Sequence, residues 1–377
     1  MVVRGNRVFV CVADGCNWGE KPREAARRAS ASFVDYLDAH YLCACDAHDV
    51  GALLLDAFVS AHNAVVAGIS EAWEAGTTTL VGAAVFPLAL ADDDDLTTSS
   101  STTNASSSSS SSGDGRYGVC VLSIGDCKCF VRDARSGRVR DVTAGNRGNL
   151  TDATDPGGRI GPYLDGGMPD TRNLALFFAR CGEDDVLVLC SDGVHDNLDP
   201  QSLGVDPGDL APAFAGRTWD EACALDGDLS ARVKERFAGE RLAALVGRQT
   251  DRMRALDSAA AAAPATGDDD DDAAGATPRG VEVALADVPR RTTTSSSSFR
   301  RSRHRLAPED ICREVTDFCA RVTTSSRAFM ESNPKGKLPK DFKRYPGKMD
   351  HTTCVAIQLS AHTLFAEHAP SSSPSAP

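Results

Sequence analysis

An apolar run that stops abruptly at an Asp-Gly pair is the feature that most constrains how this chain can fold. Residues 8–13 read Val-Phe-Val-Cys-Val-Ala, and Asp14-Gly15 follow directly. Because no polar residue alternates with the apolar ones, we interpret the run as a strand buried on both faces. A carboxylate at the edge of an apolar core is costly to desolvate unless a cation pairs with it, and glycine lets the backbone approach a ligand closely. The pattern is typical of a metal site, although an ordinary Asp-Gly turn has the same residues.

The same arrangement recurs further along the chain. The apolar run 186–190 ends at Ser-Asp192-Gly, Asp350 precedes the apolar run 353–359, and Asp126 lies in a turn between two other apolar runs. If these strand ends converge, several carboxylates share a small volume, and their repulsion raises their pKa values unless divalent cations neutralise them. Oxygen ligands without His or Cys favour Mg²⁺ or Mn²⁺.

Apolar spacing predicts both helices and strands. Helical periodicity covers residues 22–41 and 50–73, a helix is expected within 229–256, and another begins at Pro308. Strands are expected over 8–13, 80–86, 117–123, 128–132, 174–180, 186–190 and 353–359. We expect 117–123 and 128–132 to form a hairpin around Gly125-Asp126, and 174–180 to pair antiparallel with 186–190.

Three low-complexity segments separate or follow these elements. Residues 91–115 are rich in Asp, Thr and Ser, residues 258–305 are rich in Ala, Asp, Ser and Arg, and residues 360–377 are rich in Ser, Pro and Ala. Such compositions bury too little apolar area to offset their conformational entropy, so we expect two disordered insertions and a disordered tail. Without them roughly 285 residues remain, which suits one large domain over residues 1–359.

Charge and cysteine content exclude some classes of function. The net charge is -13, but Asp92–Asp95 and Asp268–Asp272 supply nine negative charges, so the remainder is nearly balanced. No basic face indicates nucleic-acid binding. No apolar stretch approaches the roughly 18 residues of a membrane helix, so we expect no membrane contact. The thirteen cysteines are an odd number without a secretory signal, which is typical of reduced thiols in the cytoplasm or nucleus. We expect a monomer.

The order of five motifs resembles the metal-dependent type 2C protein phosphatases, the PPM family. The motifs are VFVCVADG at 8–15, AGTTTLVGAAV at 75–85, VLSIGDCKCFV at 121–131, VLVLCSDGVHDNL at 186–198 and KMDHTTCVAIQL at 348–359. Five motifs in the right order are far more specific than any one of them. The resemblance implies an α+β fold, an αββα sandwich of two antiparallel sheets with helices outside and a metal centre at one end.

The resemblance also implies roles for individual residues. Asp14 and the Gly15 carbonyl would bind metal, Asp192 and Asp350 would complete one site, and Asp126 would hold a weaker third ion. The cofactors would be two or three Mg²⁺ or Mn²⁺ ions, which lower the pKa of a bridging water so that hydroxide exists near neutral pH. Asp14, Asp192 and Asp350 would then be the catalytic set of a protein serine/threonine phosphatase acting on a phosphoprotein.

Two departures from the family keep other functions open. Many members carry His after Asp-Gly, proposed as the proton donor to the leaving group, whereas this chain has Cys16. The family's upstream basic residue could be Arg4 or Arg7, but its upstream acidic ligand has no counterpart. Another residue could substitute for it or the second metal could be weakly held, but we expect instead that the chain begins inside the domain. The alternatives are a pseudophosphatase that binds or regulates with weak or no activity, and an Asp-rich structural metal-binding protein.

Overall fold

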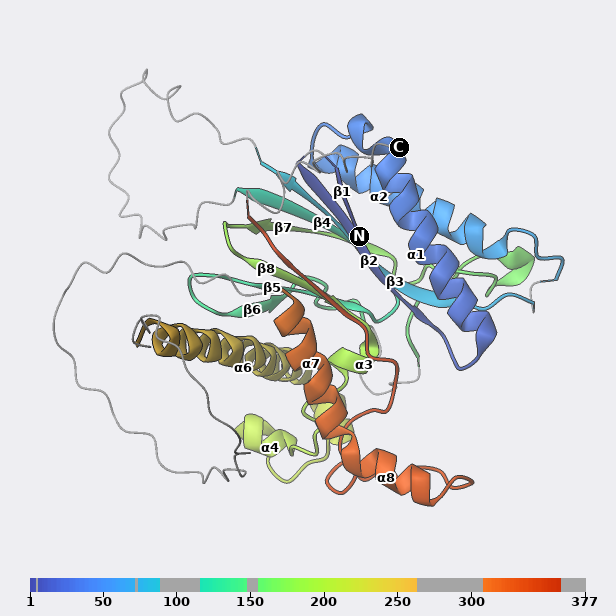
Figure 1. The fold of residues 1–377 in the computed structure, drawn as a ribbon. Coiled ribbons are helices and arrows are strands. Elements are labelled where there is room, and N and C mark those ends of the chain that lie inside the picture. Colours follow the sequence, from blue (N-terminus) through green and yellow to red (C-terminus); the bar gives the residue numbers. More distant parts are fainter. Residues whose placement is uncertain (5, 72–73, 89–115, 148–154, 263–307, 361–377) are drawn as a thin grey trace, which may run out of the picture. The chain divides into compact units, whose positions relative to one another are not determined.

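Two antiparallel β-sheets pack against each other at the centre of the computed structural model (Figure 1). The structure describes residues 1–4, 6–71, 74–88, 116–147, 155–262 and 308–360. The predicted insertion at 91–115, residues 263–305 of the second insertion and residues 361–377 of the tail lie outside these ranges. The chain divides into two compact units, Met1–Gln249 with Leu306–Pro377, and Thr250–Arg305. The sheets belong to the first unit.

The first sheet has five strands in the order β1-β2-β3-β4-β7. Its strands are β1 Val2–Arg4, β2 Arg7–Gly15, β3 Thr78–Pro87, β4 Tyr117–Ile124 and β7 Ala175–Cys181. Asp14 lies opposite Thr79, and Leu80 lies opposite Ile124. The last residues of β2 and of β4 therefore lie at the same end of this sheet.

The second sheet has four strands in the order β6-β5-β8-β9. Its strands are β5 Lys128–Arg132, β6 Val139–Asp141, β8 Val186–Cys190 and β9 Cys354–Gln358. Cys190, the last residue of β8, pairs with the first residue of β5, Lys128, and with the first residue of β9, Cys354. This register gathers the chain before β5, after β8 and before β9 at one end of the sheet.

Two expected pairings were wrong. Strands β4 and β5 lie in different sheets, so Gly125-Asp126 carries the chain from one sheet to the other instead of closing a hairpin. Strands β7 and β8 are divided between the sheets in the same way. Both β4 and β8 are buried along their whole length, so their sequences contain no polar alternation that would show which strands share a sheet.

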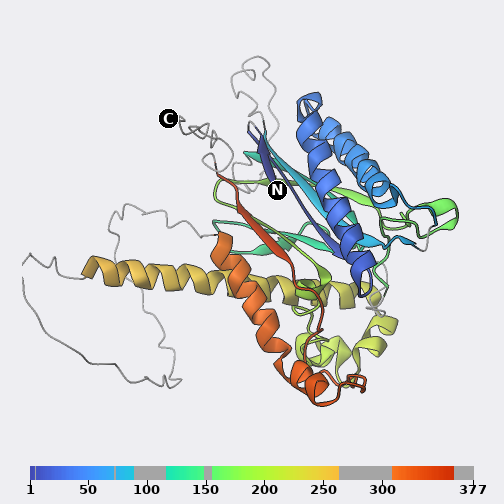
Figure 2. The same cartoon turned by 45° about the vertical axis from the view of Figure 1, so that its right-hand side comes forward.

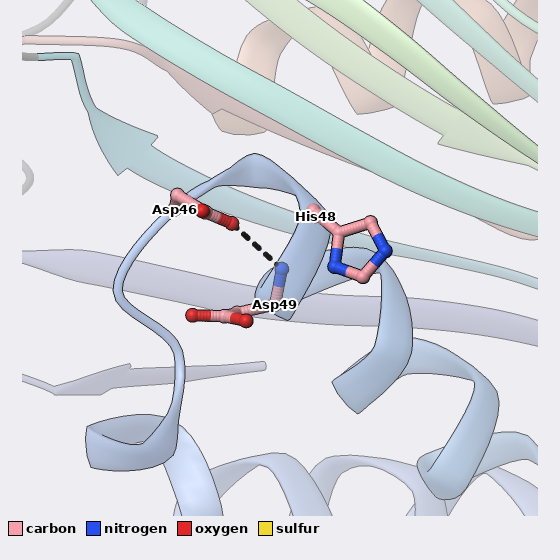
Figure 3. A group of neighbouring side chains, drawn as sticks. All are labelled: Asp46, His48 and Asp49. Atoms are coloured by element: carbon pink, nitrogen blue, oxygen red, sulfur yellow. Dashed lines mark hydrogen bonds between the residues drawn. The ribbon is translucent and has the colours of Figure 1, made fainter.

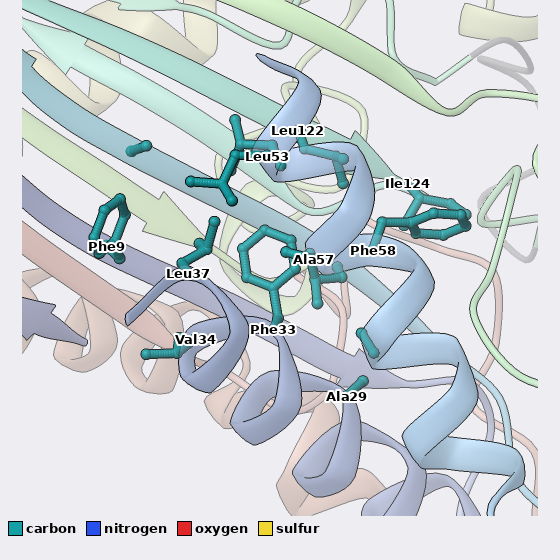
Figure 4. Close-up of a cluster of buried hydrophobic side chains, with 14 of the residues drawn as sticks. Phe9, Ala29, Phe33, Val34, Leu37, Leu53, Ala57, Phe58, Leu122 and Ile124 are labelled. Carbon is teal, nitrogen blue, oxygen red and sulfur yellow. The ribbon is translucent and has the colours of Figure 1, made fainter. Parts of the chain in front are cut away.

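Helices α1, Glu20–His40, and α2, Ala47–Val66, cover the outer face of the five-stranded sheet. Helix α2 begins after Asp46, whose carboxylate accepts a hydrogen bond from the backbone nitrogen of Asp49 at 2.9 Å (Figure 3). The helix ends before the predicted Trp73, because Ala67 is extended and Gly68 has φ of 73°. The buried side chains between these helices and the sheet include Phe9, Phe33, Leu37, Leu53 and Leu122 (Figure 4).

The four-stranded sheet is covered by α7, Pro308–Val322, and by the first part of α6, Gly227–Ala262. Their apolar side chains pack on Phe130 and Val188, and the set includes Ala238, Leu242, Leu245, Ile311 and Val315. The layers are therefore helix, sheet, sheet, helix, which confirms the predicted αββα sandwich (Figure 2). The shorter helices are α3 Asp192–His195, α4 Pro207–Leu210, α5 Trp219–Leu225 and α8 Thr324–Ser332, with 3₁₀ turns at Tyr41–Cys43, Asp165–Gly167 and Pro212–Phe214.

Helix α2 also meets, by length and composition alone, the requirement for a membrane-spanning helix, contrary to the expectation that no segment does. It is the one such helix among the described residues. Its buried residues, which include Leu53, Leu54, Ala57 and Phe58, belong to the core against the sheet. All thirteen cysteines are free thiols, as expected.

Candidate metal centre

A pocket of about 270 Å³ contains all five residues that the sequence predicted as metal ligands. It is lined by Asp14, Gly15, Cys16, Asn17, Trp18, Thr79, Asp126, Pro156, Arg159, Asp192, Lys348 and Asp350. These residues come from the end of β2 and the loop after it, the start of β3, the chain beside β5, β8 and β9, and the segment between β6 and β7. The two sheet registers therefore explain why acids distant in sequence share one pocket.

Asp14 and Gly15 are fixed by contacts of their backbone. The Asp14 carbonyl oxygen accepts hydrogen bonds from the hydroxyls of Thr78 at 2.7 Å and Thr79 at 3.3 Å. A Cβ at Gly15 would lie 2.6 Å from the Pro22 carbonyl oxygen, so a larger residue would push α1 away. The pKa of the Asp14 carboxyl is raised to about 8. The main cause is burial, and the hydrogen bond to Asp192 and the nearby negative charges raise it further. None of the basic side chains in the described part of the chain is among the causes of this shift.

Asp192 begins α3, directly after β8. Its Oδ2 lies 2.5 Å from Lys348 Nζ, whereas its Oδ1 is buried and has no hydrogen-bond donor among the described residues. The Ser191 hydroxyl donates to the His351 carbonyl oxygen at 2.9 Å and accepts from the Thr353 backbone nitrogen at 3.1 Å. These bonds hold the loop that carries Asp350 beside Asp192.

The structure adds two charged residues that the sequence did not indicate. Lys348 Nζ contacts Asp192, Asp196 and Asp350, the last two at 3.0 and 3.2 Å. Asp196 lies four residues after Asp192, a spacing that places both on one side of a helical turn and could have identified it. Lys348 precedes Asp350 by two residues in an irregular loop. The sequence of such a loop has no periodicity that would predict where its side chains point.

Arg147 is a further basic residue that the sequence did not indicate. Its guanidinium lies 3.0 Å from Asp126 Oδ2 and 2.9 Å from Asp196 Oδ1. Burial and the charge of Asp192 raise the pKa of Asp126 to about 6, and Arg147 opposes that shift. Burial would also raise the pKa of Asp196, but Arg147, His195 and Lys348 hold it well below its ordinary value.

The donor set fits a divalent cation. The carboxylates are Asp14, Asp126, Asp192, Asp196 and Asp350, and the basic groups are Arg147, Arg159 and Lys348. Five negative and three positive charges leave a formal charge of -2 for these groups. Among the described residues, the buried Oδ1 atom of Asp192 has no hydrogen-bond partner, and Asp14 forms no ion pair with a basic side chain. Together with the Gly15 backbone they offer oxygen ligands of the kind that Mg²⁺ and Mn²⁺ prefer.

Arg159 is the arginine that lines the pocket. Its backbone is held by two hydrogen bonds with Asp170, at 2.8 and 3.1 Å, and its guanidinium lies 4.2 Å from the centre of the Tyr163 ring. Its buried Nε has no hydrogen-bond partner within the described part of the chain. Arg4 and Arg7 are engaged elsewhere, Arg4 with Asp38 and Arg7 with backbone carbonyls at the other end of β2. Neither of them can therefore serve as the basic residue of this pocket.

A second acidic group, Asp46, His48 and Asp49, also gathers potential ligand atoms within 4.8 Å (Figure 3). Its two carboxylates are already used at the start of α2. Asp46 accepts from the Asp49 backbone nitrogen, and Asp49 accepts from the Cys45 backbone nitrogen at 2.9 Å. This exposed group is explained by helix capping.

Comparison with known proteins supports one family. No protein-family model matches the chain. It is 30% identical over 203 residues, 53% of its own length, to the PP2C-like domain-containing protein CG9801 of Drosophila melanogaster. Over these residues the chain is similar to a PP2C-like protein. It spans 25% of the length of that relative.

The solved structures that are similar to this chain are remote from it in sequence. The photosystem II phosphatase PBCP is 13% identical, with 95% of this chain and 92% of that chain covered and a TM-score of 0.42. The catalytic domain of the serine/threonine protein phosphatase PstP in complex with two manganese ions is 16% identical, with coverages of 62% and 88% and a TM-score of 0.30. The PPM Ser-Thr phosphatase MsPP of Mycobacterium smegmatis is 18% identical, with coverages of 63% and 86% and a TM-score of 0.30. The fold assignment rests on the layers and strand order described above.

Proposed function

We propose that this PPM-type domain hydrolyses phosphoserine and phosphothreonine esters on proteins, with Mg²⁺ or Mn²⁺ held in the acidic pocket. The observation that carries the proposal is the pair of uncompensated carboxylate groups, Asp14 and Asp192 Oδ1, in a pocket that also contains Arg159. The names of the similar proteins, PP2C-like and serine/threonine phosphatase, agree with this reaction.

Asp14, the Gly15 carbonyl and Asp192 would hold the ion. Asp126 and Asp350 stay in the proposed ligand set, but each would first exchange its basic partner, Arg147 or Lys348. A bound divalent ion supplies acidification of a water molecule and neutralisation of charge on the phosphoryl oxygens.

The chain's own residues bind and orient the substrate in this proposal. The Arg159 guanidinium offers paired N–H donors that suit two phosphoryl oxygens. Trp18 is exposed, and its ring lies 4.7 Å from the ring of His351 at an angle of 45°. Trp18 lines the pocket, so this ring pair would contact the peptide on either side of the phosphorylated residue.

A second candidate is a pseudophosphatase that binds phosphoproteins without turnover. The contact of Lys348 with both Asp192 and Asp350 favours it, because an ammonium group can neutralise these acids without any metal ion. The absence of His at position 16, where the family proton donor would stand, favours it as well.

The deciding experiment is hydrolysis of a phosphoserine peptide by the full chain in the presence of Mn²⁺ or Mg²⁺. We expect phosphate release that stops when the metal is chelated. Asp192→Asn should reduce kcat by about 10²-fold or more, since it removes a charged oxygen ligand at nearly constant shape. Asp206→Asn, at an exposed carboxylate paired with Lys343, is the matched control and should leave the rate unchanged. Wild-type turnover no greater than that of Asp192→Asn, with phosphopeptide still bound, would establish the pseudophosphatase instead.

A further inference from the structure

Lys348 places an ammonium group where three carboxylates of the pocket converge. Its Nζ lies 2.5 Å from Asp192 Oδ2, 3.0 Å from Asp196 Oδ2 and 3.2 Å from Asp350 Oδ2. Each of the three N–H donors of an ammonium group therefore has one carboxylate within reach. The side chain is 27% exposed and that of Asp196 only 4%, so these pairs are shielded from bulk water.

The backbone of Lys348 is fixed by a buried amide. Asn197 Oδ1 accepts from the Lys348 backbone nitrogen at 2.9 Å, and Asn197 Nδ2 donates to the Lys348 carbonyl oxygen at 3.0 Å. The same Nδ2 donates to the Gly193 carbonyl oxygen at 2.7 Å. Asn197 is 1% exposed. The lysine is thus tied to the turn that carries Asp192, as a positioned group and not as a surface side chain that happens to reach the acids.

Gly347 gives this loop its direction. It adopts φ of 81°, and a Cβ there would lie 2.5 Å from Asn197 Oδ1. Its backbone nitrogen donates to the Ser202 carbonyl oxygen at 2.6 Å. Only glycine is therefore compatible with the loop path that brings the next residue, Lys348, onto the carboxylates.

An ammonium group and a divalent ion cannot share this position. The nitrogen to oxygen distances of 2.5 to 3.2 Å define a wider cage than the roughly 2.0–2.1 Å of Mg²⁺–oxygen bonds. A divalent ion bound by Asp192 Oδ2 and Asp350 would place its charge against the ammonium, at a strongly repulsive separation. By contrast, Asp14 and Asp192 Oδ1 have no ion pair with Lys348 or any other described basic residue.

We propose that Lys348 is a built-in cation that takes the place of one divalent ion, so that the pocket binds a single Mn²⁺ beside Asp14 and Gly15. This inference rests on the proposed function only in assuming that the remaining oxygens bind a metal. It makes Lys348 a residue that sets the metal stoichiometry.

The test is the number of Mn²⁺ ions bound per full-length chain, measured by equilibrium dialysis with detection of free Mn²⁺ by electron paramagnetic resonance. We expect one ion for the wild type and two for Lys348→Met, which keeps most of the side-chain length and removes the charge. Lys348→Arg restores the charge and should return the count to one. Lys343→Met, at an exposed lysine paired with Asp206, is the matched control and should keep one ion. Circular dichroism identifies variants that do not fold, and Lys348→Gln replaces Lys348→Met in that case.

The outcomes separate this inference from the hydrolase proposal. Two ions in the wild type, or an unchanged count in folded Lys348→Met and Lys348→Gln, would overturn the role of Lys348 even if phosphopeptide hydrolysis depends on metal. One ion in the wild type and two in Lys348→Met, with no hydrolysis by either protein, would support the role of Lys348 and refute the hydrolase. Mn²⁺ binding by Lys348→Met alone would overturn the single-ion assignment, because the wild type would then bind no ion. No binding by any variant would overturn both.

Discussion

Arg147 is the residue on which the buried side of the pocket depends. It reaches Asp126 and Asp196 at once, and its side chain is only 11% exposed. Because both carboxylates are nearly buried, neither can recover its hydration if the arginine is lost. The Arg147 guanidinium therefore contributes more to the free energy of unfolding than the guanidinium of a surface arginine would.

Substitution of Arg147 tests this dependence. Arg147→Met should lower the free energy of unfolding by about 3–5 kcal/mol, because it leaves the buried Asp126 without its ion-pair partner and removes one of the basic partners of Asp196. Arg172 provides the comparison, since it pairs with Asp155 and Asp170 through a half-exposed side chain, and Arg172→Met should cost at most about 1 kcal/mol. Urea denaturation measures both. Equal losses for the two variants would show that Arg147 has no special role.

At this scale the sequence indicated the acids but not their basic partners. The sequence indicated four acids because each lies next to the end of an apolar run, and such runs predict where strands end. The four are Asp14, Asp126, Asp192 and Asp350. Lys348 and Arg147 lie in irregular segments, where direction depends on tertiary contacts such as those of Asn197. The metal roles of the acids remain a prediction until ion binding is measured.

Among the elements, β3 shows how closely α1 packs on the five-stranded sheet. A Cβ at Gly82 in the middle of β3 would lie 2.3 Å from Cε1 of Phe33, a fully buried side chain of α1. The aromatic ring thus occupies the space that a side chain at this position would need. The strand and the helix are complementary in shape at this point.

A pair of glycine substitutions tests this packing. Gly82→Ala should lower the free energy of unfolding by about 1–3 kcal/mol, because Phe33 must leave its position. Gly51→Ala in α2 should raise it by about 0.5–1 kcal/mol, because alanine favours the helix and its Cβ would lie at an ordinary 3.5 Å from Leu176. Thermal unfolding of both variants provides the measurement. A destabilised Gly51→Ala together with an unaffected Gly82→Ala would contradict this description of the interface.

The sequence predicted the elements more reliably than their pairing. The helices α1 and α7 and the strands β2, β3 and β4 lie where apolar spacing placed them. The partners of β5 and β8 were wrong, because strands buried on both faces carry the same apolar signature whichever sheet they join. Strand β1 was not expected, since its three residues are too few to show a pattern.

Considered as a whole, the molecule has its pocket near one end of the β3-β4 hairpin, and the predicted insertion at 91–115 connects the two strands beyond the other end. Asp14 pairs with Thr79 near one end, whereas Pro87 pairs with Tyr117 at the other. Beyond that pair, the backbone nitrogen of Leu88 donates to the Arg116 carbonyl oxygen at 2.8 Å. The two strands are therefore hydrogen-bonded to each other as far as Leu88 and Arg116, close to where residues 91–115 begin and end.

Replacing residues 91–115 by a short Gly-Ser turn should accordingly preserve the fold. A shorter connection between adjacent strand ends changes the closure entropy by only about 1 kcal/mol, so we expect a melting temperature within a few degrees of the wild type and unchanged Mn²⁺ binding. Calorimetry and the dialysis assay measure the two properties. A chain that no longer unfolds cooperatively would show that the segment contributes to stability.

The convergence of Asp14, Asp192 and Lys348 also has a consequence for how the protein is made. A ribosome releases Asp14, Asp126 and Asp192 long before the loop that carries Lys348 and the edge strand β9. Until that loop docks on Asn197, the nascent chain holds its acids without the cation that balances Asp192 and Asp196. The pocket can therefore be completed only after the ribosome has released the loop that carries Lys348 and Asp350.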